Sequence, residues 1–362
     1  MKYNISKQSN KPAYLQLYNQ LRNDIVSGAY SFGSKLPSKR ILSEEIGTSV
    51  ITVEHAYSLL CDEGYIESCQ RKGYFVIYKK KDFISNNIGP ESQSKFPTIK
   101  SSTVKPEFPF YLLAKTMRKV LADYGQSILE KSHNKGCLQL REAICAYLKR
   151  TIDINAEPNQ VIIGAGSEYL YSLVVQLLGK ERIYALENPS YDKIQQVYEA
   201  HGIRCQLLEL GGNGIKTSFL EKTDATVLHI TPFNSYPSLI TASASKRYEY
   251  LRWAEERDAV VVEDNYDSEL TVLKKNEDTL FSQADNGRVI YINTFSQTIS
   301  PSVRVGYMVL PSSMVSTYDE KLGFYSCTVP AFEQYVLAEL INSGDFERHI
   351  NRVRREKRKQ LR

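Results

Sequence analysis

The sequence predicts an α/β protein with a small, mainly helical N-terminal domain and a larger three-layer domain built on a mostly parallel sheet. Three observations support this fold class. Short helical patterns crowd residues 1–78, residues 79–107 show neither a helical nor a strand period, and from residue 108 short apolar runs alternate with amphipathic stretches. The expected domains are therefore 1–78 and 108–362, joined by a linker over 79–107.

The first helical pattern begins beside Pro12, a residue suited to the first turn of a helix. One face of this helix carries apolar side chains at helical spacing, namely Tyr14, Leu17, Leu21 and Ile25. Gly28 follows the last of them and is expected to end the helix, because glycine readily adopts the left-handed conformation found there.

Two further helices are expected after the first. Ser38 can cap a short second helix that ends at Gly47. Either Thr48 or Ser49 can cap the third helix, which covers about 50–61 and has Val53, Tyr57 and Leu60 on its inward side.

Two short strands are predicted next, at 65–67 and 74–77, with a polar, basic tip at 69–73 between them. Helix, helix, tight turn, helix and β-wing is the order of a winged helix-turn-helix. The first turn of the third helix would then face the major groove of DNA, and Arg71 and Lys72 on the wing would lie near the backbone or the minor groove. That first turn carries Ser49, Val50, Thr52 and Val53. A small helical dimerisation module would show the same pattern.

The N-terminal segment contains the motifs Leu36-Pro37-Ser38, Thr52-Val53, Glu63-Gly64-Tyr65 and Gly73-Tyr74-Phe75-Val76. With these motifs it resembles the DNA-binding domain of the GntR family of bacterial regulators. The resemblance implies double-stranded operator DNA as a partner. It also implies a set of contact residues, namely Ser38, Lys39, Arg40, Ser49, Thr52, Arg71, Lys72 and Gly73. Val50 stands where the family usually has an arginine, so the resemblance gives no operator preference.

Residues 79–107 begin with a run of lysines and continue with Ser, Asn, Gln and three prolines. We expect a flexible linker with a coil span of roughly 25–30 Å. Such a span would let the DNA-binding domain reach a partner subunit.

The second domain is expected to alternate strands with helices. Strand-like runs cover 161–163, 183–186, 225–230, 260–263, 289–293 and 305–310. Helix-like stretches cover 167–178, 191–201 and 244–258. Ligands of such sheets bind at the carboxyl ends of the strands, so the residues that follow each strand are the candidate ligand contacts.

Polar and aromatic residues follow successive strands at these ends. Gly164-Ala165-Gly166-Ser167-Glu168 combines glycines with a helix N-terminus, as a phosphate site would. Tyr191 follows the second strand, and Asp264 and Tyr266 follow the fourth. A phosphate loop, an aromatic ring, a carboxylate and a phenol are what a pyridine-ring phosphate cofactor needs. Each feature taken alone also fits an ordinary turn between a strand and a helix.

The second domain contains the motifs IIGAGSEY, LENPSY, TPFNSYPS, VVEDNYDSEL and NTFSQTISPSVRVGYMVLP. With them it resembles the fold-type I aminotransferases, a class of PLP-dependent transferases, as found in the MocR subfamily of GntR-type regulators. Winged helix-turn-helix, linker and aminotransferase body, in that order, is the architecture of that subfamily. The resemblance implies pyridoxal 5'-phosphate as cofactor and a set of binding residues, namely Ser167, Glu168, Tyr191, Asn234, Asp264, Tyr266, Thr294, Ser296 and Arg304.

The resemblance also implies a role for these side chains. Asp264 would pair with the pyridine nitrogen, and Tyr191 would stack on the ring. Asn234 and Tyr266 would address the phenolic oxygen of the ring. The remaining residues would surround the phosphate.

Gln297 stands where the family has the lysine that forms a Schiff base with the cofactor. An amide nitrogen has a delocalised lone pair and cannot form an imine, so we expect no catalytic residue here and non-covalent cofactor binding at most. Lys246, Lys274 and Lys275 lie outside the motif and are poor substitutes. The sequence stops at Arg362 within a basic helical stretch, before the C-terminal subdomain that carries the carboxylate-binding arginine in the family. We expect either that the sequence is a fragment or that the subdomain is missing.

Composition and charge narrow the function classes. Hydrophobic residues make up 42% of the 362 residues, and no apolar run is long enough for a membrane span. The six cysteines form no CxxC pair and no ligand-spaced cluster with the five histidines, so we expect no metal site and no disulfide framework, and a cytoplasmic location fits. Residues 1–80 carry 11 Lys and Arg against 7 Asp and Glu, and residues 346–362 carry 8 against 2. Basic ends of this kind fit a polyanionic partner, and they equally fit solvated helix faces. For residues 346–362 we favour the face of a helix over a nucleic-acid-binding tail.

We therefore expect a DNA-binding transcriptional regulator whose aminotransferase-like body senses a small effector, either pyridoxal phosphate or an amino compound, and forms a homodimer. An effector in the body would change the spacing of two recognition helices. Two alternatives stay open. One is an active aminotransferase fused to a DNA-binding domain, which Gln297 disfavours. The other is a degenerate body that serves only as a dimerisation scaffold.

Overall fold

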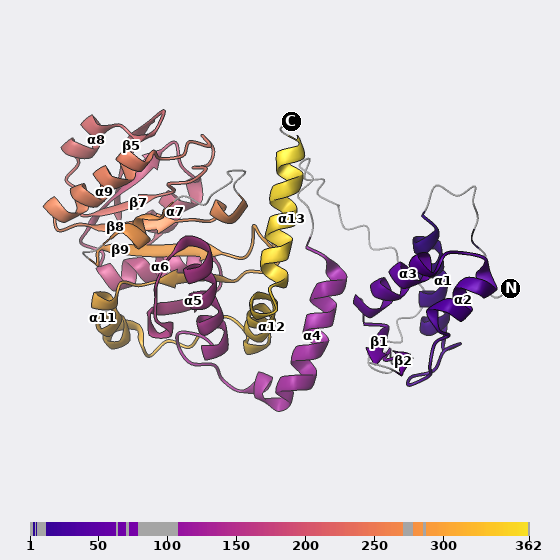
Figure 1. Cartoon of the computed structure of the whole chain (residues 1–362). Coiled ribbons are helices and arrows are strands. Elements are labelled where there is room, and N and C mark those ends of the chain that lie inside the picture. The colour runs from indigo at the N-terminus through magenta and orange to yellow at the C-terminus, as the bar shows by residue number, and fades with distance from the viewer. Residues whose placement is uncertain are drawn as a thin grey trace, which may run out of the picture. The chain divides into compact units, whose positions relative to one another are not determined.

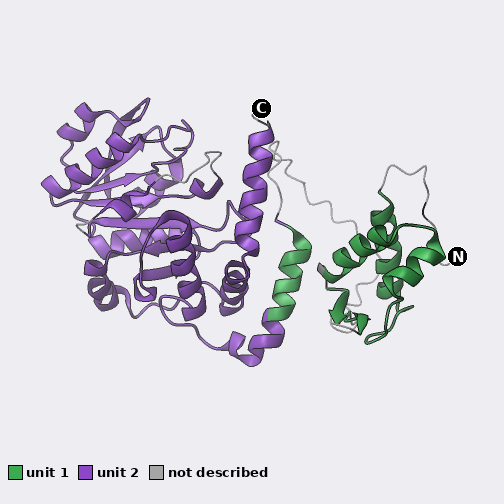
Figure 2. Ribbon diagram, viewed as in Figure 1, with its two compact units in different colours: residues 1–105, 109–119 green, residues 106–108, 120–362 purple. Residues whose placement is uncertain are grey.

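The computed structural model describes residues 3, 5, 12–62, 64–69, 72–78, 108–270, 278–284 and 287–360. The chain divides into two compact units, one of residues 1–105 with 109–119 and one of residues 106–108 with 120–362 (Figure 2). Each unit is considered by itself below. The segment expected to be a linker, 79–107, lies outside the described residues, as do Lys274 and Lys275.

The described part of the N-terminal unit contains three helices and a two-stranded hairpin before residue 79 (Figure 1). The helices are α1 (Ala13–Ser27), α2 (Lys39–Ile46) and α3 (Val50–Asp62). The hairpin pairs β1 (Ile66–Cys69) with β2 (Gly73–Val76) in antiparallel register. These elements confirm the predicted winged helix-turn-helix, and both strands extend further toward the tip than the sequence predicted.

Local capping explains where these helices begin and end. Gly28 follows α1 with a φ of +88°, a conformation that glycine adopts at little cost. The backbone N–H of Ile41 donates to Ser38 Oγ at 3.3 Å, so Ser38 caps α2. The backbone N–H of Thr52 donates to Ser49 Oγ at 3.1 Å, so Ser49, rather than Thr48, caps α3.

One apolar cluster holds the N-terminal unit together. It includes Leu17, Leu21 and Ile25, as predicted for the first helix, but Tyr18 in place of the predicted Tyr14. It contains Tyr3, Leu17, Tyr18, Leu21, Ile25, Leu36, Leu42, Val53, Ala56, Tyr57, Leu60, Ile66 and Val76. Burial of each aliphatic side chain contributes about 2 kcal/mol to folding. Tyr57 is fully buried, and its hydroxyl donates to the carbonyl oxygen of Pro37 at 2.8 Å. This bond ties α3 to the residues just before α2.

The second unit is built on a sheet that has eight strands within the described residues. They are β3 (Val161–Gly164), β4 (Ile183–Asn188), β5 (Arg204–Gly211), β6 (Gly214–Ile215), β7 (Val227–Ile230), β8 (Val260–Asp264), β9 (Val289–Thr294) and β10 (Gly306–Val309). Their order across the sheet is β3-β10-β9-β8-β7-β4-β5-β6. Strands β10 and β6 are antiparallel to their neighbours, and the others run in one direction. The predicted strands are confirmed, whereas β5 and β6 were not predicted.

Helices cover both faces of this sheet. Within the described residues, the helices wholly in this unit are α5 (Leu138–Ile152), α6 (Ser167–Leu178), α7 (Asp192–Ala200), α8 (Thr217–Lys222), α9 (Ala244–Glu256), α10 (Leu280–Gln283), α11 (Ser312–Leu322), α12 (Ala331–Asn342) and α13 (Asp345–Gln360), with short 3-10 turns at Gly125–Leu129, Pro158–Gln160 and Ser268–Leu270. Helix α4 (Phe110–Tyr124) is divided between the two units, with residues 110–119 in the first. One buried cluster joins α6, α7 and α11 to side chains such as Val260 and Val262 of β8. A second joins α8, α9 and α10 to Val261 of the same strand. Because alternate residues of a strand point to opposite faces, the unit has three layers, as predicted.

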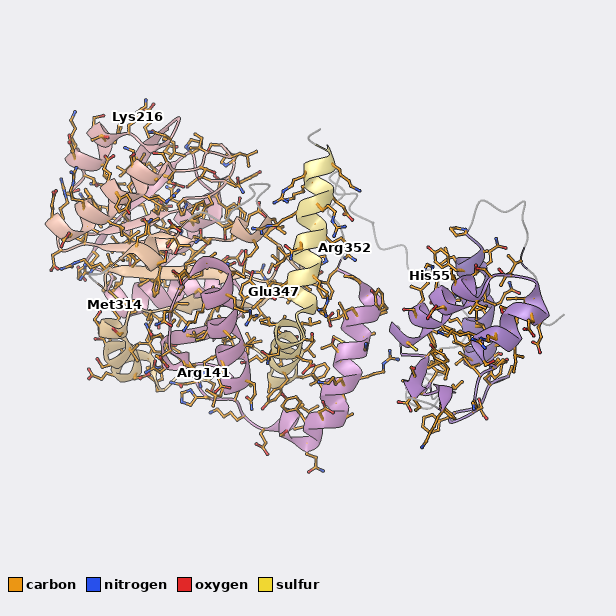
Figure 3. All side chains as sticks on the ribbon, viewed as in Figure 1. His55, Arg141, Lys216, Met314, Glu347 and Arg352 are labelled. Carbon is orange, nitrogen blue, oxygen red and sulfur yellow. The ribbon has the colours of Figure 1, made fainter. Side chains whose placement is uncertain are left out.

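The basic helix α13 packs onto the same unit. Glu347 near its start forms an ion pair with Arg150 of α5 at 2.8 Å (Figure 3 labels Glu347 and Arg352). Arg354 Nε donates to the carbonyl oxygen of Glu269 at 2.8 Å. At least one basic side chain of α13, that of Arg354, therefore contacts its own domain.

Membrane spans, metal sites and disulfides were not expected, and the described residues give the following findings on each. Among them, no helix combines the length and the apolar character that crossing a bilayer requires. No group of three or more metal-ligating side chains is found in that part of the chain. All six cysteines are described, and each is a free thiol.

Candidate functional site

The carboxyl ends of the parallel strands bring the predicted ligand residues to one edge of the sheet. Strands β4, β7, β8 and β9 run in the same direction, so their last residues share that edge. Asp264 is the last residue of β8, and Thr294 is the last residue of β9.

Asp264 is the most deeply buried acidic group among the predicted ligand residues, and its side chain is only 2% exposed. Its Oδ2 accepts a hydrogen bond from the Tyr171 hydroxyl and lies 3.7 Å from His229 Nε2. The Tyr198 hydroxyl in turn lies 2.7 Å from His229 Nδ1. Asp264 Oδ1 is buried and has no hydrogen-bond partner among the described residues. An acceptor left in this state is costly unless a ligand supplies a donor.

Tyr171 is held in its donor form. Burial, and then the adjacent Asp264, raise the pKa of Tyr171 well above its ordinary value, so the phenol keeps its proton. Tyr171 lies on α6, one turn after Ser167 and Glu168. This helix therefore links the loop after β3 to the carboxylate at the end of β8.

Asn234 and Tyr266, which were both predicted to contact the phenolic oxygen of the cofactor, lie next to each other at this edge. The Tyr266 hydroxyl donates to the backbone carbonyl oxygen of Asn234 at 3.0 Å. Asn234 has a φ of +53°, and its N–H donates to Thr241 Oγ1 at 3.2 Å. Burial raises the pKa of Tyr266, so this phenol also stays protonated. Tyr191 follows β4 with 39% of its surface exposed and presents an edge-to-face contact to Tyr236.

The loop before α6 forms a turn against which Arg304 lies. Gly166 has a φ of +88°, and a Cβ at this position would come within 3.2 Å of Arg304 Nη2. Arg304 Nη2 also pairs with Glu168 Oε2 at 3.2 Å, and Lys193 Nζ pairs with Glu168 Oε1 at 2.8 Å. The hydrogen bond from Lys193, with Arg304 nearby, lowers the pKa of the Glu168 carboxyl. Two cations and the α6 N-terminus thus surround one ionised carboxylate.

Thr294 and Ser296 hold the chain that carries Arg304. Thr294 Oγ1 lies 3.1 Å from the carbonyl oxygen of Val305, and Ser296 Oγ donates to the carbonyl oxygen of Val303 at 2.8 Å. The two hydroxyl oxygens are 3.1 Å apart. Both side chains therefore bond to the backbone on either side of Arg304.

Four residues of this site were not predicted from the sequence. Tyr171, Tyr198 and His229 surround Asp264, and Lys193 shares Glu168 with Arg304. His229 gave a signal in the sequence, because it is a polar residue inside the apolar run of β7. The other three lie on helices where tyrosine and lysine are common, so no local pattern marks them.

The candidate DNA surface lies on α2, α3 and the wing. Ser49 and Arg40 are exposed, and Thr52 is half-buried. Lys39 forms an ion pair with Glu54 of α3 at 2.6 Å, with both side chains partly exposed. Val53 is fully buried in the core of the unit, which confirms its expected place on the inward side of the third helix. The further expectation that Val53 would face the groove is therefore wrong.

Two further residues of the predicted surface have clear structural roles. Ser38 caps α2, and Gly73 begins β2 with a φ of +110°. Lys72 is exposed beside Gly73, whereas Arg71 lies outside the described residues. The sequence did not single out Lys35, whose exposed side chain lies so near the wing that a Cβ on Gly73 would be 3.0 Å from its Cε.

Comparisons with known proteins match both units. Residues 13–76 match the family model of bacterial regulatory proteins of the gntR family, and residues 107–362 match the model of aminotransferase class I and II. The chain is 31% identical over 357 residues to YdeL of Bacillus subtilis (strain 168), an uncharacterized HTH-type transcriptional regulator. That alignment covers 96% of this chain and 77% of YdeL.

A second relative and a solved structure support the same assignment. MocR of Rhizobium meliloti, a probable rhizopine catabolism regulatory protein, is 26% identical over 381 residues, covering 97% of this chain and 76% of MocR. The crystal structure of LysN, an α-aminoadipate aminotransferase from Thermus thermophilus in complex with N-(5'-phosphopyridoxyl)-L-leucine, is similar with 27% identity and a TM-score of 0.60. The similarity covers 68% of this chain and 64% of LysN, so this chain spans less than two thirds of that enzyme. The chain therefore belongs to the MocR-type HTH transcriptional regulators of the GntR family, in which a winged helix-turn-helix is fused to an aminotransferase class I and II domain.

Proposed function

We propose that the aminotransferase-like domain of this regulator binds pyridoxal phosphate reversibly, as an effector that controls DNA binding by a homodimer. The unpaired Oδ1 of Asp264 carries the proposal, because it is a buried acceptor at the ligand-binding edge of the sheet. The turn at Gly166 beneath Arg304 adds a place for the phosphate. LysN, which shares this fold, was crystallised with a phosphopyridoxyl compound, and this similarity supports the choice of ligand.

Each predicted side chain except Glu168, whose carboxylate pairs with Lys193 and Arg304, then has a task. Asp264 would accept a hydrogen bond from the protonated pyridine nitrogen, while the Tyr171 hydroxyl holds its carboxylate in place and His229 Nε2 lies 3.7 Å away. Asn234, after β7, and Tyr266, after β8, would contact the phenolic oxygen. Tyr191 offers a ring face, and Ser167 and Arg304 would bind the phosphate. Thr294 and Ser296 would join them by turning their hydroxyl protons from the backbone carbonyl oxygens of Val305 and Val303 to the phosphate. When bound, pyridoxal phosphate supplies an aldehyde that amines attack and a ring that withdraws electrons.

We propose no transaminase activity for this domain. Gln297 lies in the turn after β9, where the lysine of the family would attach the cofactor. Its amide has no nucleophilic lone pair, so this chain would hold the ligand by non-covalent contacts alone. An effector that must bind and leave is consistent with that mode of binding.

A titration of the purified chain with pyridoxal phosphate, followed by absorbance, tests this function. We expect saturable binding that dialysis reverses. Borohydride treatment should leave no ligand covalently attached to the chain, and sedimentation velocity should show a dimer. Absence of saturable binding would favour the alternative in which the body is only a dimerisation scaffold.

Replacing Glu168 by glutamine should tighten the binding of pyridoxal phosphate about fivefold. The ionised Glu168 carboxylate occupies Lys193 and Arg304 and repels a phosphate at the same turn. A partly exposed ion pair is worth up to about 1 kcal/mol, which corresponds to that factor in affinity. Pyridoxal, which lacks the phosphate, is the control ligand, and its affinity should not change. Equal effects on both ligands, or a weaker binding of pyridoxal phosphate, would show that Glu168 does not compete with the phosphate.

Replacing Arg40 or Lys72 by alanine should weaken DNA binding and reduce its dependence on salt. Both side chains are exposed on the candidate DNA surface. Each phosphate contact releases about one counterion, so the slope of log affinity against log salt should fall by about one. The exposed Lys222 of α8 provides the matched control, and Lys222→Ala should leave the slope unchanged. If neither Arg40→Ala nor Lys72→Ala alters DNA affinity, the contact surface lies elsewhere.

A further inference from the structure

The first turn of α3 presents aliphatic side chains to the outside of the N-terminal unit. Val50 is 39% exposed and Ile51 is 66% exposed. The opposite side of the same helix is fully buried, through Val53, Ala56, Tyr57 and Leu60. The packing of the core therefore fixes the rotation of α3 and leaves Val50 and Ile51 outside that core.

The polar groups of this turn are already engaged within the domain. Ser49 Oγ accepts from the N–H of Thr52, and the Ser49 and Thr52 hydroxyl oxygens are 2.9 Å apart. Glu54, one turn further along, is held in an ion pair by Lys39. The sequence of α3, VITVEHAYSLLCD, contains neither lysine nor arginine. The outward face of the first turn is thus aliphatic.

This chemistry restricts which feature of a base pair the helix can read. In a helix-turn-helix the N-terminal residues of the second helix of the motif contact base edges in the major groove. Guanine is read by a bidentate arginine or lysine, which α3 lacks, whereas the feature read by apolar side chains is the C5-methyl group of thymine. Exposed basic side chains on neighbouring elements, such as Arg40, Lys35 and Lys72, remain for the phosphates.

We propose that Val50 and Ile51 read thymine methyl groups, so that each operator half-site has thymine, rather than guanine, opposite the first turn of α3. The inference rests on the DNA-binding role of the winged helix-turn-helix and is independent of any ligand in the aminotransferase-like domain. The phosphate contacts set the strength of binding, and the two aliphatic side chains set its sequence preference.

The test begins with selection of binding sites by the full chain from a library of random DNA duplexes. Each thymine of the selected half-site is then replaced in turn by deoxyuridine, which removes only the methyl group. We expect at least one replacement to weaken binding about fourfold, the value of one buried methyl group. That loss should disappear in Ile51→Ala or Val50→Ala, because the methyl group then has no partner to contact.

Val26→Ala is the matched control, since Val26 is an aliphatic residue of α1 with 37% of its surface exposed. This variant should keep the full sensitivity to deoxyuridine, and circular dichroism should show all three variants folded. Selected half-sites that bind equally well with deoxyuridine at every position, or that depend on guanine opposite α3, would overturn the inference while leaving DNA binding intact. Failure to select any sequence would instead contradict sequence-specific DNA binding itself and, with it, the inference.

Discussion

Replacing Gln297 by lysine is expected to change pyridoxal phosphate from a reversible ligand into one that borohydride fixes to the chain. Gln297 lies in the turn after β9, two residues after the buried Phe295. In the sequence it comes after Thr294 and Ser296 and before Arg304. The rest of the motif is therefore in place, and only the amine is missing. A primary amine at this position can attack the aldehyde of the ligand, which an amide cannot do.

The measurement is mass spectrometry of the intact chain and its peptides after borohydride reduction. The unchanged chain should gain no ligand mass, and Gln297→Lys should gain the mass of one reduced ligand on the peptide that contains position 297. Gln176→Lys, with the same change near the end of α6, is the control and should remain unmodified. A Gln297→Lys variant that stays unmodified at saturating ligand would mean that the pocket no longer holds the cofactor, and the scaffold alternative would replace our proposal.

Replacing Asp264 by alanine should weaken the binding of pyridoxal phosphate roughly tenfold to a hundredfold. The buried Oδ1 of Asp264 would lose its bond to the pyridine nitrogen, and a hydrogen bond to a charged group is worth about 1.5–3 kcal/mol. The change also leaves the Tyr171 hydroxyl without its acceptor, so some loss of thermal stability is expected as well.

Ligand affinity, rather than stability, distinguishes the two roles that Asp264 could have. The control is Asp224→Ala, because Asp224 is an exposed carboxylate paired with Arg204 at 3.0 Å away from the strand ends of the site. Calorimetric titration of both variants gives the comparison. If Asp264→Ala lowers the melting temperature but binds pyridoxal phosphate as tightly as the unchanged chain, Asp264 is only a structural residue at the end of β8.

The parts of the fold that could be predicted from the sequence depend on residues that are close together in the chain. Ser38 and Gly28 mark helix ends through bonds and backbone conformations within a few residues, and these are confirmed. The central strands are continuous apolar runs because both of their faces are covered. Strand β5 lacks such a run, since Leu208 is its only buried residue, and it was therefore missed.

The parts of the site that could not be predicted depend on contacts between distant residues. Tyr171 reaches Asp264 across 93 positions of the chain, and His229 comes from a different strand. The apolar spacing of α3 did predict its inward side, with Val53, Tyr57 and Leu60, but it gave no sign that the aliphatic Ile51 would be exposed. Motifs identify the loops of such a site, but the network behind Asp264 follows only from the tertiary structure.

The central claim is that ligand binding in the aminotransferase-like domain alters DNA binding by the winged helix-turn-helix. It is tested most directly by the DNA affinity of the full chain, measured by fluorescence anisotropy on a selected site with and without saturating pyridoxal phosphate. We expect the dissociation constant for DNA to change at least about fivefold, with no change for pyridoxal at the same concentration. Because the coupling is reciprocal, DNA should change the dissociation constant of pyridoxal phosphate by the same factor. A chain that is saturated with pyridoxal phosphate and binds DNA with unaltered affinity would contradict the account.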